Sequence, residues 1–205
     1  MFDLPPPDPA IEIVVASQGM SKGLRQTEGP QAIVRPSLQF GRISAGVYVK
    51  NVASPDAEGE GGIFIGYSAP VGRLRIAPVV TYKRLLDTRG RPDAEAWEFG
   101  LSIARPGRFA PYLSLYYSPD ELGGTRESLY AEAGASVRVS RSFTLSASLA
   151  HRARAGGPDY NAFSAGIGHQ ATDRISFELR YHDTDRSALG PAYRRRIVAS
   201  LRARF

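Results

Sequence analysis

Polar and apolar residues alternate with a period of two along most of this 205-residue chain. In FTLSASLAHR, which begins at Phe143, every second residue from Phe143 to Leu149 is apolar and the residues between are mostly Thr or Ser. In YRRRIVASLRARF, residues 193–205, arginines favour one parity, whereas Ile197, Ala199 and Leu201 occupy the other. Because successive side chains of a β-strand point to opposite faces, this pattern predicts strands with one apolar and one polar face.

Twelve segments follow this pattern, at roughly residues 10–18, 31–40, 42–51, 61–68, 72–83, 95–104, 108–118, 127–139, 142–152, 160–170, 173–183 and 193–205. Short connections with turn residues alternate with longer polar stretches, at 19–30, 52–60, 84–94, 119–126, 153–159 and 184–192. This alternation places the long connections at one end of the array and both termini at the other, as in outer-membrane barrels. We therefore expect an all-β, 12-stranded antiparallel up-and-down transmembrane β-barrel over residues 10–205, after an extended lead-in over residues 1–9.

Strands of soluble barrels also alternate between polar and apolar residues, but with the apolar face inward. The placement of aromatic residues therefore decides between a soluble and a transmembrane barrel. On the apolar parity, one set lies near the short connections: Phe40, Tyr67, Phe109, Phe143 and Phe205. A second set lies near the long ones: Tyr82, Trp97, Tyr117, Phe163, Tyr181 and Tyr193. Two aromatic girdles around an aliphatic band are typical of two membrane interfaces, so we expect the apolar face to contact lipid.

The expected location is the bacterial outer membrane, with periplasmic termini. No stretch of the sequence has the 18 or more apolar residues of a transmembrane helix. The first residues, MFDLPPPDPA, lack the basic and apolar regions of a secretory signal, so we expect no signal peptide in this chain. The expected partners are outer-membrane lipid, lipopolysaccharide and the barrel-assembly machinery, because a last strand that ends on Phe205 resembles the assembly signal of such proteins.

The polar parity is strongly basic. It carries Arg35, Lys50, Arg73, Arg75, Lys83, Arg138, Arg152, Arg174, Arg180, Arg194, Arg196, Arg202 and Arg204, against Glu12, Glu98, Glu132 and Glu178. The excess of basic over acidic residues on this parity is larger than the net charge of +6 for the whole chain. We assign other acids, including Glu60 and Glu121, to the long loops.

A 12-stranded barrel is intermediate between small filled barrels and wide porins. An arginine-lined wall lowers the electrostatic barrier for anions and raises it for cations, which predicts a narrow passive channel for small anionic solutes. The alternative is an occluded barrel whose Arg and Glu side chains pair across the lumen, with a structural or surface-interaction role. The sequence leaves open whether the 19–30 loop enters the lumen.

Other classes of function lack support in the sequence. There is no cysteine, and the three histidines have no zinc-type spacing, so we predict no metal, cofactor or catalytic residues. The arginines follow the strand period instead of forming a stripe with stacking aromatics, which argues against nucleic-acid binding.

Several motifs resemble the TorF-type putative porins of Gram-negative outer membranes. They are VASQGMSKGLRQTEGPQAIVRP, SAGVYVKNVASP, IFIGYS and ELRYHDTD. The matching positions are Ser17, Gly23, Gln26, Thr27, Gly29, Pro30, Gly46, Tyr48, Asn51, Gly66 and Tyr67. The family pattern has an aromatic residue near Met20 and an arginine near Lys22, where this chain departs from it. The resemblance covers the whole barrel and implies a pore.

Overall fold

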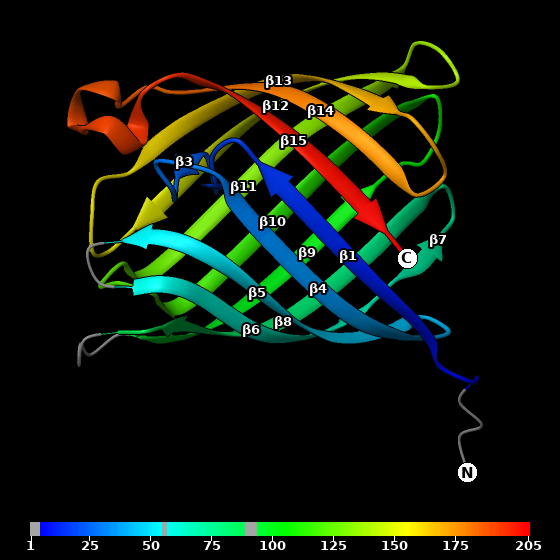
Figure 1. Cartoon of the computed structure of the whole chain (residues 1–205), viewed down its shortest axis with the longest axis horizontal. Coiled ribbons are helices and arrows are strands. Elements are labelled where there is room, and N and C mark those ends of the chain that lie inside the picture. Colours follow the sequence, from blue (N-terminus) through cyan, green and yellow to red (C-terminus); the bar gives the residue numbers. More distant parts are fainter. Residues whose placement is uncertain (1–4, 55–56, 89–93) are drawn as a thin grey trace.

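Residues 5–54, 57–88 and 94–205 of the computed structural model are described, and they form a closed 12-stranded antiparallel barrel (Figure 1). Its strands are β1 (Asp8–Ala16), β4 (Gln31–Phe40), β5 (Ile43–Ser54), β6 (Ala57–Tyr67), β8 (Leu74–Leu86), β9 (Glu95–Ala104), β10 (Phe109–Glu121), β11 (Arg126–Arg138), β12 (Phe143–Arg154), β13 (Tyr160–Gln170), β14 (Ile175–Thr184) and β15 (Arg196–Arg204). The barrel closes where β1 pairs with β15. The predicted fold class is therefore confirmed.

The two ends of the barrel differ. The start of β1, Phe205 and the short connections lie at one end, which we call the turn end, where β7 (Ala69–Val71) pairs with the start of β8 (Figure 1). The opposite end, the loop end, carries two short 3-10 helices, η1 (Ser187–Leu189) and η2 (Pro191–Tyr193), between β14 and β15. The hairpin of β2 (Met20–Ser21) and β3 (Leu24–Arg25) follows β1.

Two of the predicted long loops are partly strand. The pairing of β5 with β6 continues through Lys50 and Glu60 to Ser54 and Ala57, and β10 and β11 extend into the 119–126 stretch in the same way. The predicted ends of these strands were placed where the alternating apolar side chains stop. Backbone hydrogen bonds do not require apolar side chains, however, so the ladder continues beyond the aliphatic band.

The strand register is regular except at two places. Irregularities occur between Asn51 and Ser54 and between Ser118 and Glu121. A proline inside a strand favours a bulge or a local ladder break, which we expect at Pro36, Pro78 and Pro111. Pro78 pairs with Leu101 and Pro111 with Ala135, whereas the β4–β5 ladder omits Arg35 and Pro36 and resumes in the same register at Ser37. The alternation of inward and outward side chains is therefore preserved along most of the wall.

The apolar face of the barrel is its outer face. Side chains in the aliphatic band are widely exposed, with Leu145 at 47%, Leu149 at 66% and Ile197 at 64%. A continuous apolar band of this kind requires an apolar surrounding such as lipid. Across the part of the chain that the structure describes, no helix has the length and hydropathy to cross a membrane.

A cation in the aliphatic band should destabilise the barrel. Leu145 lies between the turn-end aromatic Phe143 and the loop end of β12 and faces outward. We expect Leu145→Lys to lower the free energy of unfolding by about 2–4 kcal/mol, because the ammonium group must enter hydrocarbon. Urea unfolding in lipid vesicles measures the change. The neighbouring control Thr144→Lys faces the lumen, and an equal loss in both variants would contradict an outer apolar band.

Candidate functional site

The lumen wall is formed by side chains that alternate with the outward apolar ones. The strand pairings place eleven of the predicted residues on this inward face: Arg35, Lys50, Arg75, Glu98, Glu132, Arg138, Glu178, Arg180, Arg196, Arg202 and Arg204. Lys83 and Arg152 also lie on this face. Inward residues are thus aligned across strands, as in the pairs Glu12 with Arg204 and Glu12 with Arg35.

Three predicted lumen residues lie outside the strands. Arg73 is in the turn between β7 and β8, Arg174 directly precedes β14, and Arg194 follows η2; all three are exposed. The prediction for Arg194 was wrong because β15 begins only at Arg196. The segment before it forms 3-10 turns that end at Tyr193, so strand alternation does not apply there.

Tyr193 corrects a second prediction. Its ring lies edge-on to Tyr160, with 5.6 Å between ring centroids, and its hydroxyl accepts a 2.6 Å hydrogen bond from Arg154. Tyr193 is therefore part of the loop-end packing and not a girdle residue on the outer wall. The other predicted girdle aromatics lie on outward positions, among them Trp97 (51% exposed) and Phe109 (57%).

The 19–30 loop crosses the lumen. Lys22 and Gly23 form the two-residue turn of the β2–β3 hairpin, with φ of 49° and 81°, as a type I′ turn requires. The Tyr160 hydroxyl on β13 donates a 2.5 Å hydrogen bond to the carbonyl oxygen of Lys22. A Cβ on Gly23 would lie 2.6 Å from the Cβ of Ala162, so the hairpin contacts β13 too closely for a larger residue.

The base of the hairpin is fixed to the wall that carries it. The buried Thr27 accepts a 2.6 Å hydrogen bond from the Gly19 amide and donates one to the Gly29 carbonyl. Gln26 accepts a 2.9 Å hydrogen bond from Lys50 on β5, and Asn51 donates one to the Pro30 carbonyl. Most of the residues named here also carry the sequence resemblance, so those motifs encode how the loop folds inward.

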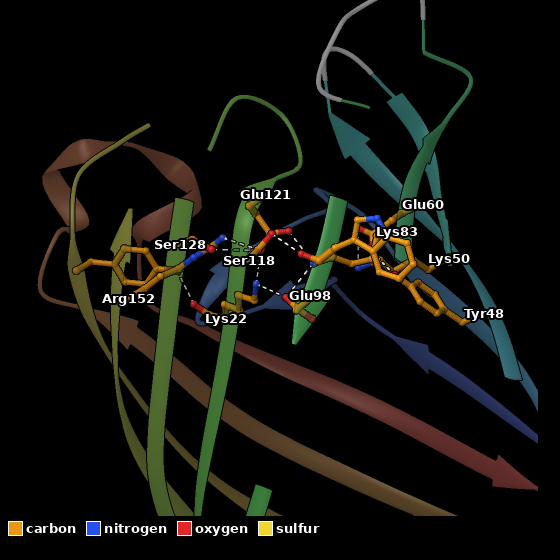
Figure 2. A network of polar contacts seen from close by, with 12 residues as sticks. Lys22, Tyr48, Lys50, Glu60, Lys83, Glu98, Ser118, Glu121, Ser128 and Arg152 are labelled. Atoms are coloured by element: carbon orange, nitrogen blue, oxygen red, sulfur yellow. Dashed lines mark hydrogen bonds and ion pairs between the residues drawn. The ribbon is translucent and has the colours of Figure 1, made fainter. Parts of the chain in front are cut away.

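A buried cluster of charged side chains holds the hairpin tip. Figure 2 shows these polar contacts, in which Glu121 pairs with Arg152, Lys22 and Lys83. Lys22 pairs with both Glu98 and Glu121. Lys83 Nζ lies 2.9 Å from Glu98 and 2.6 Å from Glu121. Two lysines and two glutamates thus form a closed ring, and their side chains are 13% exposed or less.

A second ion pair lies beside this ring. Lys50 Nζ is 3.0 Å from the carboxylate of Glu60, which also accepts a 2.7 Å hydrogen bond from the Tyr48 hydroxyl. Both Glu60 and Glu121 were assigned to loops from the sequence, and both assignments were wrong. β6 begins before Glu60, and the irregularity after Ser118 brings Glu121 inward instead of Asp120.

The hairpin and this cluster divide the lumen. A cavity of about 350 Å³ lies toward the loop end, beside Leu122 and Gly123. Two larger cavities, of about 530 and 480 Å³, include residues nearer the turn end. Lys22, Glu60 and Lys83 line both the 350 and the 530 Å³ cavities, so they separate the two.

The 480 Å³ cavity has a basic and hydroxylated lining. Arg138, Arg180 and Arg202 line it together with Glu178 and several serines. Arg180 donates hydrogen bonds to Ser146, Ser164 and Glu178. The cavity therefore offers several guanidinium groups against one carboxylate.

A closed 12-stranded antiparallel barrel with an aliphatic exterior and a polar, partly hollow interior has the architecture of a transmembrane β-barrel. The chain is similar in structure to the KdgM porin, with a TM-score of 0.68, 10% identity, and coverage of 96% of this chain and 99% of that chain. It is also similar to the NanC porin, with a TM-score of 0.62, 6% identity, and coverage of 95% and 97%. The COG4313 outer membrane channel from Pseudomonas putida F1 gives a TM-score of 0.55 at 11% identity, covering 96% and 94%.

These likenesses establish a shared fold. No protein-family model matches the chain, and no curated protein matches it.

Proposed function

We propose that this protein is an outer-membrane passive channel that favours small anions. The observation that carries the proposal is the basic lining of the lumen on the turn side of the hairpin. There the carboxylate of Glu12 contacts three arginines. The N–O distances are 3.4 Å to Arg35, 3.7 Å to Arg202 and 2.8 Å to Arg204. A wall with uncompensated positive charge raises the local concentration of anions and opposes cations.

Organic anions are the solute class that we propose. One solved structure of the same fold is titled "KdgM porin in complex with disordered oligogalacturonate", which concerns an acidic saccharide. In the present chain, serines and Arg180 lie side by side in the 480 Å³ cavity. Hydroxyl and guanidinium groups together suit carboxylates that also carry hydroxyls.

Ion selectivity tests the proposal. We expect the refolded protein in planar bilayers to give a reversal potential that favours chloride over potassium in a KCl gradient. Arg138→Gln with Arg202→Gln should lower the chloride-to-potassium permeability ratio at least about twofold, because two cations leave the lumen. The control Arg84→Gln removes a charge from the outward face of β8. A cation preference in the unmodified protein would overturn the proposal.

An occluded barrel is the second candidate, and the hairpin is the observation that favours it. The Lys22 ring and the tyrosine contact tie the hairpin tip to three further strands, β9, β10 and β13. If this tie holds permanently, the barrel does not conduct and serves a structural or surface-interaction role. The absence of current under all voltages and salts, in protein shown to be folded, would favour this candidate.

We also propose that the chain is a TorF-type porin with periplasmic termini. Support comes from the matching residues, since Gly23, Gln26 and Thr27 have specific roles in folding the hairpin inward. Protease added to intact cells tests the orientation. Cleavage at a site engineered into the exposed η1 segment, with protection of a tag at Phe205, is the expected result.

A further inference from the structure

Arg152 is buried without a full set of partners. Its side chain is 9% exposed, and its nearest polar partners are the Tyr160 hydroxyl at 3.5 Å and the Glu121 carboxylate at 3.6 Å. Among the described residues, its Nε has no hydrogen-bond partner. A guanidinium group carries five N–H donors arranged to match a carboxylate, and contacts at these distances are weak. Arg152 therefore has only one distant anionic partner, Glu121, and its Nε donor is unused among the described residues.

The charge of the surrounding cluster is also unbalanced. Lys22, Lys83 and Arg152 carry three positive charges, whereas Glu98 and Glu121 carry two negative ones. Lys50 and Glu60 neutralise each other beside them. A buried charge without a counter-ion is unfavourable, so the cluster is one anion short of neutrality.

The 350 Å³ cavity adjoins this incompletely paired guanidinium group. Its lining combines cations with apolar side chains. The cationic residues are Lys22, Arg25, Lys83, Arg152 and Arg154, and the apolar residues are Leu24, Val52, Leu85 and Leu122. Glu60 and Glu121 are the acids in the lining. The volume is sufficient for a single-ring acid, and the mixed lining suits a ligand with an apolar body and one carboxylate.

We propose that this cavity is a binding site for small organic carboxylates with an apolar body. Arg152 pairs with the ligand carboxylate, which shares the cations of the cluster with Glu121. The leucines and Val52 contact the apolar part. This site would add solute recognition at the loop end to the proposed channel function. It rests on that function because solutes must be able to reach the loop end.

Ligand-observed fluorine NMR tests binding directly, without any need for conduction. The probes are 4-fluorobenzoate and its neutral counterpart 4-fluorobenzyl alcohol, titrated against the refolded full chain in detergent micelles. We expect saturable line broadening for the acid only. Arg152→Met should weaken binding at least about tenfold, because it removes a charged hydrogen-bonding partner. Arg84→Met, on the outward face of β8, is the matched control and should bind as the unmodified protein does.

A second variant separates a ligand contact from a purely structural role of the cluster. Glu121→Gln removes the carboxylate that competes for Lys22, Lys83 and Arg152, so we expect tighter binding of 4-fluorobenzoate. A structural role alone predicts weaker or unchanged binding. Folding of each variant is checked by the electrophoretic shift between folded and unfolded barrel.

The outcomes distinguish this site from the channel proposal. Binding that is lost in Arg152→Met and strengthened in Glu121→Gln supports the site, whether or not the protein conducts. No saturable binding, or equal binding of acid and alcohol, overturns the site even if anion-selective currents are present. Binding without current leaves the site in place and overturns the channel.

Discussion

Removal of the β2–β3 hairpin should raise the single-channel conductance several-fold. The structure allows a clean deletion, because the Gln26 amide donates a 2.7 Å hydrogen bond to the Gly19 carbonyl across the base of the hairpin. We therefore propose replacing residues 20–25 with Asn-Gly, which forms the same type of tight turn without reaching the lumen. The 350 and 530 Å³ cavities, now separated by Lys22 and its partners, would then join.

The control for this experiment is a deletion at the same end of the barrel. Residues 187–189 form the exposed helix η1 and lie between β14 and β15. Their removal should leave the conductance within the scatter of the unmodified protein. Equal conductance with and without the β2–β3 hairpin would show that the hairpin is not the constriction, and the limiting element would have to be sought in the wall.

Lys83→Met should cause the largest loss of stability. Lys83 pairs with Glu98 and Glu121, and all three side chains are 13% exposed or less. Removal of Lys83 breaks one direct ion pair of each buried carboxylate, and Arg152, at 3.6 Å from Glu121, does not replace these contacts. We therefore expect a loss of about 3–5 kcal/mol in the free energy of unfolding. Urea or guanidinium unfolding of the refolded barrel in micelles measures the difference.

The neighbouring residue provides the matched control. Arg84 pairs with Glu95 at 3.7 Å, but the two side chains are 62% and 53% exposed. Because solvent screens such a pair, Arg84→Met should cost less than about 1 kcal/mol. A similar small effect for Lys83→Met would mean that water enters the cluster freely and that the hairpin tip is not held by charge.

The barrel itself is predictable from the sequence because strand alternation is a local property. FTLSASLAHR and YRRRIVASLRARF each show which face is apolar without reference to the rest of the chain. The pairing of Leu145, Leu179 and Leu201 with apolar neighbours follows from this pattern. Residues that lie within regular strands, such as Arg180, were therefore assigned to the lumen from parity alone.

The constriction is less predictable because it depends on irregular and long-range features. One extra residue after Ser118 reverses the parity and brings Glu121 inward, and its segment SPDEL reads as an ordinary polar loop. The Lys22-Gly23 turn has a local signal, but its position depends on Glu98, Glu121 and Tyr160, which are remote in the chain. The sequence left the path of this loop open for that reason.

The hairpin also has a mechanical consequence. It is carried by β1 and β4, whereas Lys22 contacts β9 and β10, which lie across the circle in strand order. A hydrogen-bonded cylinder resists stretching along its strands but ovalises easily when squeezed from the side. Because the hairpin connects opposite walls, it opposes flattening of the barrel cross-section under lateral pressure from the bilayer.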